Sequence, residues 1–315
     1  MKKGFTLIEM IISIVILAIL SAGTFVSLKH LYLRSAKSRA MSDLSFDSQV
    51  VVDQVAALMY DRIPSSVIGY NGIDNFQSIY TVDNNFTVLE WIGVASEAQK
   101  VGAYSGFIDM NASDGTTLKL ISSGVSFAML NTVMNNKFGP GFFWPDIALV
   151  FAGSFDDGAI YYSNDFNSTF GWHNNNADKI LQFNFPAADG NITLQNPKPD
   201  EIFEKYYLVD SAYAVARGSD VNIAVPPCND LNISNADINN TLFLFYNYRP
   251  WKGETFCGDR GANASPKGNV TILSQNVSGF EAGVIDGTIY FSMTMNKVIR
   301  GSENNVTISK QKAVY

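Results

Sequence analysis

The feature that most limits what this chain can fold into is an apolar segment at its N-terminus. From Phe5 to Leu28 the only charged residue is Glu9. A helix needs about 20 apolar residues to cross the hydrocarbon core of a bilayer, and this run exceeds that length. Lys2 and Lys3 precede the run and favour a cytoplasmic position for the N-terminus. We therefore expect one membrane span over residues 5–28, with the rest of the chain on the opposite side.

A cleavable secretory signal and an ordinary single-span anchor are the two alternatives for this segment. A cleavable secretory signal has a shorter apolar core followed by small residues at the cleavage site, whereas this apolar run continues past any such site. An ordinary single-span anchor would leave Glu9 without a role. A carboxylate inside a membrane span is costly and is tolerated when an opposite charge lies close by, so Glu9 is a candidate functional residue with a partner to be named.

The sequence Lys3-Gly4-Phe5-Thr6-Leu7-Ile8-Glu9 resembles the class III leader of type IV pilins and of type II secretion pseudopilins. The resemblance implies that a prepilin peptidase cleaves between Gly4 and Phe5 and methylates the new N-terminus at Phe5. It implies an assembly role for Glu9, which would meet the positively charged N-terminus of a neighbouring subunit. The implied partners are the peptidase, the inner membrane and other pilins or pseudopilins, contacted through the N-terminal helix. The implied location is the inner membrane, crossed once, with the head in the periplasm and possible extraction into a filament.

The helix predicted for the membrane span continues beyond it, because no proline occurs before Pro64. Apolar residues follow at steps of three and four if Ser48 fills one place, a period typical of an amphipathic helix. These positions are Met41, Leu44, Val51, Val55 and Leu58. We expect one helix from Phe5 to about Arg62, about 87 Å long at 1.5 Å per residue.

Beyond Pro64 the apolar pattern changes to short runs of period two, separated by Asn, Gly and Asp, as expected for strands. No linker or repeat divides this part. The expected organisation is a leader of residues 1–4, a helix of residues 5–63 and a β-rich head of residues 64–315. The fold class is α+β, a long helix packed on a mostly antiparallel head. The predicted strands are residues 87–92, 116–121, 147–151, 179–185, 206–215, 241–248, 270–273 and 288–295.

The net charge and the two cysteines limit the classes of function that are open to this chain. The net charge of −7 at pH 7 does not support a basic face for direct binding of nucleic acid. Cys228 and Cys257 are the two cysteines, and in an exported domain they are most simply one disulfide. Closing a loop of about 30 residues would stabilise the fold by about 3 to 4 kcal/mol. The alternative, a metal held by both thiolates, would need other ligands, and His173 is distant in sequence.

Asn-x-Ser/Thr occurs ten times, and seven of the ten have Asp or Glu two residues before the Asn. This longer pattern matches the acceptor sequence of bacterial N-linked glycosylation, and such a site indicates surface exposure in an exported domain. The alternative is an Asn-rich composition that produces the short pattern by chance. Three sites lack the acid: Asn263, Asn269 and Asn276. The seven candidates are Asn85, Asn111, Asn167, Asn191, Asn232, Asn239 and Asn305.

The sequence offers little for catalysis. Residues 124–128 only approximate a nucleophile elbow and lack its strand-turn-helix context. His173 is expected in a solvated loop. Asp156, Asp157 and Asp165 are weak candidates for a Ca²⁺ site, because they lack the spacing of an EF-hand. We therefore expect no enzymatic activity and no cofactor, with Ca²⁺ as the weaker alternative.

The expected function is that of a minor pilin or pseudopilin. The closing segments, residues 273–280 and 287–293, are similar to those of J-type and W-type minor subunits. Major pilins are shorter and usually carry their cysteine pair close to the C-terminus, which also favours a minor subunit. Such a subunit serves a type II secretion pseudopilus, a DNA-uptake (competence) pseudopilus or a surface pilus, and the sequence leaves these open. The alternative is a tip adhesin that binds a ligand through the aromatic insertion of residues 142–172. A membrane-anchored hydrolase is disfavoured, because an anchor does not require the leader motif.

Overall fold

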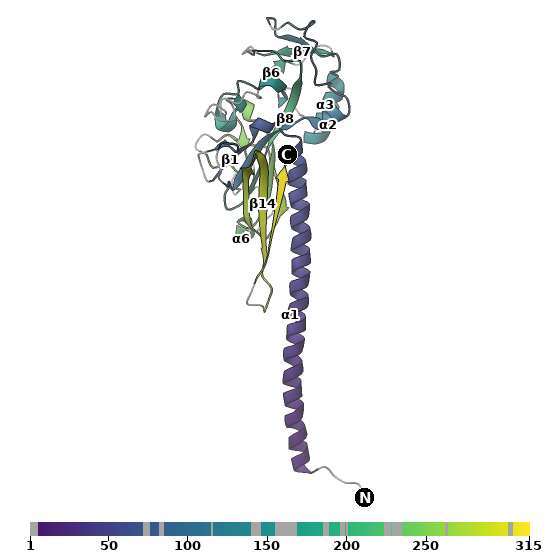
Figure 1. Cartoon of the computed structure of the whole chain (residues 1–315), viewed down its shortest axis with the longest axis vertical. Helices are drawn as coiled ribbons and strands as arrows, with labels where there is room; N and C mark the ends of the chain where they lie inside the picture. Colours follow the sequence, from purple (N-terminus) through teal and green to yellow (C-terminus); the bar gives the residue numbers. More distant parts are fainter. Residues whose placement is uncertain are drawn as a thin grey trace.

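The computed structural model describes residues 6–71, 76–81, 85–114, 116–139, 146–154, 169–184, 189–195, 199, 201–223, 228, 235–261, 264–301 and 305–315. Within these ranges a long helix, α1 (Leu7–Tyr60), carries a β-rich head at its C-terminal end (Figure 1). The first half of α1 projects away from the head, and the second half lies alongside it. The predicted fold class is confirmed: α+β, with a long helix on a mostly antiparallel head.

Helix α1 contains 54 residues, which corresponds to about 81 Å. It ends two residues before the predicted Arg62, and Pro64 begins a short 3₁₀ turn, η1 (Pro64–Ser66). Ser48 is buried, as the periodicity required, but Met41 is 53% exposed, so its predicted place on the packed face is wrong. The packed stripe follows the row through Ala40, one residue and therefore about 100° away from Met41. The stripe consists of Ala40, Leu44, Ser48, Val51, Val52, Val55 and Met59.

The larger sheet of the head has ten strands in the order β2-β1-β3-β8-β5-β6-β7-β4, with β9 also paired to β8 and β12 to β9. All its pairings are antiparallel. The longest strand, β8, is central: β3 pairs along one edge, while β5 and β9 share the other. The strands are β1 (Ile68–Tyr70), β2 (Gln77–Ser78), β3 (Val88–Val94), β4 (Lys119–Ile121), β5 (Ala148–Phe151), β6 (Leu181–Asn184), β7 (Asn191–Leu194), β8 (Tyr206–Arg217), β9 (Leu242–Tyr248) and β12 (Asn269–Ser274).

A second sheet packs directly on α1. It is an antiparallel meander of β13 (Val277–Ile285), β14 (Thr288–Lys297) and β15 (Val306–Val314), and β15 and β14 contact the helix (Figure 1). Phe86 and Ala282 exchange two backbone hydrogen bonds of 2.7 and 2.8 Å, which join this sheet to the larger one. Two short strands, β10 (Thr255–Phe256) and β11 (Pro266–Lys267), form a separate parallel pair.

Short helices complete the head. Each of the eight predicted strands overlaps an observed one, although only residues 119–121 of the predicted strand 116–121 are extended. Helix α3 was not predicted, even though its buried residues Phe127, Leu130 and Met134 are three and four apart, a helical spacing. The helices are α2 (Ser96–Lys100), α3 (Phe127–Phe138) and α6 (Asn235–Ile238), with 3₁₀ turns η3 (Ala152–Ser154), η4 (Trp172–Asn174) and η6 (Pro250–Lys252).

The hydrophobic core forms three clusters. The first lies between α1, the second sheet and one face of the larger sheet, and it includes Trp91, Phe280 and Phe291. The second lies on the other face of the larger sheet, and the third lies beneath α2 and α3. Full burial of one such side chain stabilises the fold by about 1.5 to 3 kcal/mol. Because the first cluster includes the stripe on α1, the head and the second half of α1 fold around a common core.

Candidate functional site: the stem helix and its attachment to the head

The first half of α1 exposes apolar side chains all round. Every large hydrophobic side chain from Leu7 to Leu28 is more than half exposed. The most apolar window of 18 residues has a mean hydropathy of 2.5, and none of it is buried. A helix that is apolar on all sides belongs in a protein core or a membrane, and no core covers this one in the described residues. The helix therefore fits a single-pass membrane anchor, in agreement with the span predicted for residues 5–28.

Glu9 caps the start of α1. Its Oε2 atom accepts hydrogen bonds from the Thr6 backbone N–H at 2.9 Å and from the Thr6 hydroxyl at 2.8 Å, while the Glu9 N–H donates to Thr6 Oγ1 at 3.4 Å. This capping box satisfies donors that would otherwise be unpaired at the helix terminus. The Glu9 side chain is exposed, so its carboxylate remains accessible. The predicted cleavage site, Gly4 and Phe5, lies outside the described residues.

The second half of α1 is held mainly by its buried stripe. At the rim of this contact Lys312 Nζ lies 3.1 Å from Asp53 Oδ1, and Lys297 Nζ lies 3.6 Å from Asp43 Oδ2. Exposed ion pairs of this kind contribute about 0 to 1 kcal/mol each. The apolar packing beneath β14 and β15 therefore provides most of the attachment, and the ion pairs fix its register.

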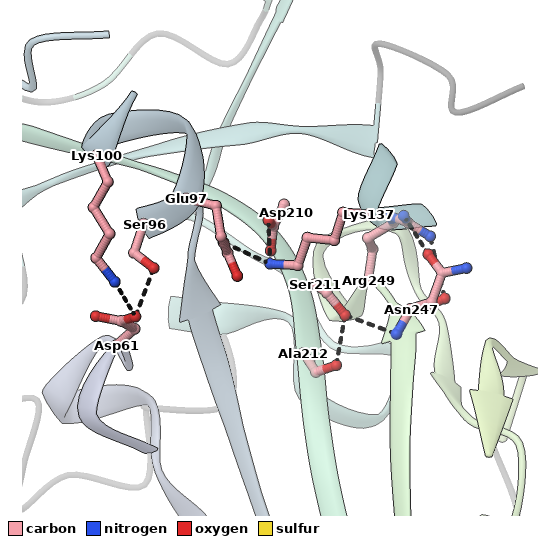
Figure 2. Close-up of polar contacts among 10 residues, drawn as sticks. All are labelled: Asp61, Ser96, Glu97, Lys100, Lys137, Asp210, Ser211, Ala212, Asn247 and Arg249. Atoms are coloured by element: carbon pink, nitrogen blue, oxygen red, sulfur yellow. Dashed lines mark hydrogen bonds and ion pairs between the residues drawn. The ribbon is translucent and has the colours of Figure 1, made fainter. Parts of the chain in front are cut away.

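The C-terminal end of α1 is fastened through Asp61. Its Oδ2 atom accepts a hydrogen bond from the Ser96 hydroxyl at 2.6 Å and lies 3.3 Å from Lys100 Nζ (Figure 2). The Asp61 carbonyl accepts a further hydrogen bond from the Val94 N–H at 2.8 Å. The end of the stem is thus bonded to β3 and α2, so the stem and the head are joined at both edges of their contact.

A buried ion pair fixes α3 to the central strand. Lys137 Nζ lies 2.9 Å from Asp210 Oδ2 and 3.1 Å from Glu97 Oε2 (Figure 2). Burial alone would lower the pKa of Lys137, but the carboxylate of Asp210 outweighs it and holds that pKa above its ordinary value. Loss of one partner would leave an uncompensated buried charge, at a cost of about 3 to 5 kcal/mol.

Asp210 lies where β8 changes partners along one edge. There β5 pairs with β8 as far as Val209, and β9 pairs with it from Ala212. Between these points the Ser211 hydroxyl donates to the Ala212 carbonyl at 2.7 Å and accepts from the Asn247 N–H at 2.8 Å (Figure 2). Side-chain oxygens therefore replace the missing strand partner, as a buried backbone requires. This polar cluster therefore holds together the strands that meet on β8.

His173 is buried, so its predicted place in a solvated loop is wrong. Its side chain is 8% exposed, with Nε2 3.1 Å from Glu90 Oε1 and Nδ1 3.1 Å from Asp259 Oδ2. Phe76 stacks on the ring at a centroid distance of 4.2 Å. Burial opposes the charged form, but the two carboxylates outweigh it and raise the pKa of His173 to about 10.

The His173 cluster is structural rather than catalytic. At neutral pH the protonated ring donates to a carboxylate on each side, so it has no lone pair with which to act as a base. The Tyr248 hydroxyl donates to Glu90 Oε2 at 2.7 Å and completes the cluster. These contacts tie η4 to β3 and to the loop after β10.

Sequence reasoning missed the buried acids of both clusters. Glu90 is the single acid of an otherwise apolar strand, β3, and Asp210 is the single acid of the mostly buried strand β8. A lone charge in a buried strand requires a partner. That pattern could have indicated that both acids are paired. The spacing of the sequence does not show that their partners are His173 for Glu90 and Lys137 for Asp210.

The predicted disulfide between Cys228 and Cys257 is confirmed, with a Cα–Cα distance of 5.4 Å. Both residues are fully buried in the second core cluster. The weak calcium candidates Asp156, Asp157 and Asp165 lie outside the described residues. Among the residues that the structure does describe, no group of His, Cys, Asp and Glu side chains is arranged to hold a metal ion.

The described acceptor asparagines differ in their surroundings. Asn111 and Asn239 are exposed in turns, and Asn305 is exposed at the start of β15. Asn191 is half-buried in β7.

Asn85 is hydrogen-bonded through both atoms of its amide group: its nitrogen donates to Glu281 Oε2 at 3.0 Å and its oxygen accepts from the Tyr290 hydroxyl. Asn167 and Asn232 lie outside the described residues.

Comparison with known protein families finds a match for the N-terminal region of the chain. Residues 1–25 match the family described as the prokaryotic N-terminal methylation motif. No curated protein and no solved structure matches the chain. The chain is therefore pilin-like in carrying an N-methylation leader followed by an apolar helix, and this leader implies processing by a prepilin peptidase. Proteins with such a leader are generally structural and not enzymes.

Proposed function

We propose that this pilin-like chain is a minor pilin or pseudopilin, an assembly subunit of a filament that serves type II secretion, DNA uptake or a type IV pilus. The main support for the proposal is that the two halves of α1 have different surroundings. Its first half is apolar and uncovered, while its second half is buried under the head. Such a stem can move from lipid into a bundle of similar helices without any change in the fold of the head, because both surroundings are apolar.

Glu9 supports assembly rather than simple anchoring. The capping box uses Oε2, and the exposed side chain leaves the carboxylate able to bind a cation as well. In lipid a positively charged neighbour would stabilise the ionised carboxylate of Glu9, because an isolated charge is costly there. The cleaved N-terminus of an adjacent subunit is the partner that the leader supplies.

The head favours a minor subunit of the J or W type. The chain of 315 residues is longer than major pilins, and its disulfide closes an internal loop rather than a C-terminal one. Its acidic net charge gives no support for direct DNA binding. We also propose N-glycosylation of the head, with exposed Asn111 and Asn239 as the favoured acceptors and Asn85 disfavoured by its hydrogen bonds.

A second candidate is a ligand-binding head on the same stem. A cavity of about 240 Å³ opens beside Trp251, Gln182 and Asn176, and Asn176 follows the predicted aromatic insertion by four residues in the sequence. An aromatic ring with amide side chains suits a small polar ligand. Binding of such a ligand that is lost in Gln182→Leu, while filament assembly is retained, would favour this candidate.

Two substitutions of Glu9 test the main proposal. Glutamine keeps the capping box but removes the charge, whereas valine removes both. We expect both Glu9→Gln and Glu9→Val to insert and to be cleaved, and neither to cross-link to neighbouring stems or to support secretion or uptake in the host. Normal activity of Glu9→Val would refute pairing, and activity of Glu9→Gln alone would limit Glu9 to capping.

A further inference from the structure

We propose that residues 298–301, the described start of the turn that follows β14, together with the facing part of α1, bind the phosphate groups of anionic phospholipids at the membrane surface. The proposal requires that α1 anchors the chain in a membrane, but it does not require filament assembly. It assigns the chain a second contact with the bilayer, made by the head rather than by the stem.

The turn lies at the level of the lipid headgroups. The apolar surface of α1 extends from Leu7 to Leu28, about 33 Å, which slightly exceeds the roughly 30 Å hydrocarbon core. Gly301 in the turn lies next to Leu33. Leu33 is about 7.5 Å further along the helix than Leu28, and the headgroup layer on each side is about 5 to 8 Å thick. In Figure 1 the β14–β15 hairpin points along α1 towards its N-terminal end.

An open cleft of about 530 Å³ separates the turn from the helix. Tyr32, Ser35, Arg39 and Asp43 line it from α1. Lys297, at the end of β14, and Val298 and Arg300, in the turn, line it from the other side. Tyrosine is enriched at membrane interfaces, where its ring contacts acyl chains and its hydroxyl contacts headgroups. The composition of this cleft is therefore suited to the boundary between lipid and water.

Arg39 and Arg300 supply the phosphate-binding groups. Both are exposed, and neither makes an ion pair with a described carboxylate. Lys297, in contrast, is paired with Asp43 at 3.6 Å. A guanidinium binds phosphate in a bidentate manner, so two of them across one cleft can hold a headgroup phosphate between the helix and the turn. Val298, which is 74% exposed beside them, offers an apolar side chain to the acyl region.

The distribution of charge supports a lipid partner. The whole chain carries a net charge of −7, yet residues 29–43 and 297–304 contain six basic and two acidic residues. Four of the six basic residues lie within residues 29–43, directly after the membrane span and on its non-cytoplasmic side. Basic residues normally concentrate on the cytoplasmic side, so their position here calls for an explanation. Attraction to anionic headgroups accounts for basic residues at this position.

The test places a polarity-sensitive fluorophore on the turn. Because both native cysteines are bonded to each other, Val298→Cys provides the only free thiol in the full chain. The labelled protein is placed in nanodiscs of phosphatidylglycerol or of phosphatidylcholine. The control label is at Ile285→Cys. This residue is 57% exposed and lies at the turn between β13 and β14, at the opposite end of β14 from residue 298.

We expect the label at residue 298 to report an apolar environment in phosphatidylglycerol but not in phosphatidylcholine, and the label at residue 285 to remain in water in both. Each basic side chain near an anionic surface favours the bound state roughly fivefold, so Arg39→Gln with Arg300→Gln should lower the ratio of docked to undocked turn roughly 25-fold. Lys119→Gln with Lys267→Gln removes the same charge from exposed sites elsewhere in the head and should change nothing.

Three outcomes would overturn the proposal. The first is a label at residue 298 that is equally hydrated in both lipids. The second is the same spectral change produced by inorganic phosphate in uncharged detergent micelles, which would indicate a site for free anions. The third is a disulfide between two Val298→Cys chains, which would indicate an interface between copies.

Discussion

Raising the pH from 7 to 9 should weaken the head, because His173 is protonated in the folded protein. The ring lies between the carboxylates of Glu90 and Asp259, which favour its charged form. In the unfolded chain these partners are lost. The folded state therefore holds one proton more than the unfolded state over the interval between the two pKa values.

The size of the effect follows from the shift. The pKa of His173 rises from 6.5 to about 10 on folding. Below pH 6.5 both states are protonated and the stabilisation is complete; it decreases by about 1.4 kcal/mol per pH unit as the pH rises, and it is lost above about pH 10. Between pH 7 and pH 9 the free energy of unfolding should fall by about 2 to 3 kcal/mol.

Urea denaturation of the full chain in detergent micelles measures this change. Trp172 adjoins His173 and is 1% exposed, so the fluorescence of the four tryptophans includes a signal from this cluster. His30 is the only other histidine, and it is exposed on α1. His30→Gln should retain the full loss of stability between pH 7 and pH 9, whereas His173→Gln should show a smaller one.

Histidine-selective NMR tests the premise directly, because the spectrum contains two ring systems. The His173 ring should remain doubly protonated at pH 8. A neutral ring at pH 8, or a free energy of unfolding that is constant or rising between pH 7 and pH 9, would contradict the assignment of a charged histidine to this cluster.

Three other predictions follow from the leader, the second buried cluster and the acceptor asparagines. Mass spectrometry of the membrane fraction should find a mature chain that begins at N-methylated Phe5, and retention of the leader would contradict the family resemblance. In urea denaturation Lys137→Met, which leaves Asp210 unpaired, should cost about 3 to 5 kcal/mol, whereas the matched change at exposed Lys100 should cost less than about 1 kcal/mol; equal costs would contradict the burial argument. Glycopeptide mapping from the native host should find glycans on Asn111 and Asn239, which are exposed in turns, and none at Asn85, whose amide is hydrogen-bonded; the reverse pattern would contradict the argument from hydrogen bonding.

The stem was largely predictable because its determinants are local. An unbroken apolar run, a helical period and a proline stop specify α1 to within two residues at its C-terminal end. The strand positions were also predictable, since alternation and turn residues are local signals. The error at Met41 arose because several rows of a helix share similar spacing, and only the partner surface decides which row is buried.

The interior of the head was less predictable because its determinants are non-local. His173 stands in a polar, Asn-rich sequence that is typical of a solvated loop, yet its partners Glu90 and Asp259 are 83 and 86 residues away. The same holds for Lys137 and Asp210, which are 73 residues apart. Charges that are buried in pairs can be suspected from a lone acid in an apolar strand, but the pairing depends on the sheet order. The division into residues 1–4, 5–63 and 64–315 stays a prediction.

The contact between α1 and β15 also constrains when the molecule can mature. Lys312 and Asp53 meet across a separation of 259 residues, so a strand that is synthesised long after the stem packs on the face of α1. Contacts this distant in sequence form late, since closing so long a loop carries a large entropic cost. Until β14 and β15 are in place, the second half of the stem exposes part of the stripe from Ala40 to Met59. A chain that stops before β15 would expose part of this stripe in addition to the apolar first half of the stem, so incomplete subunits would expose more apolar stem surface than finished ones.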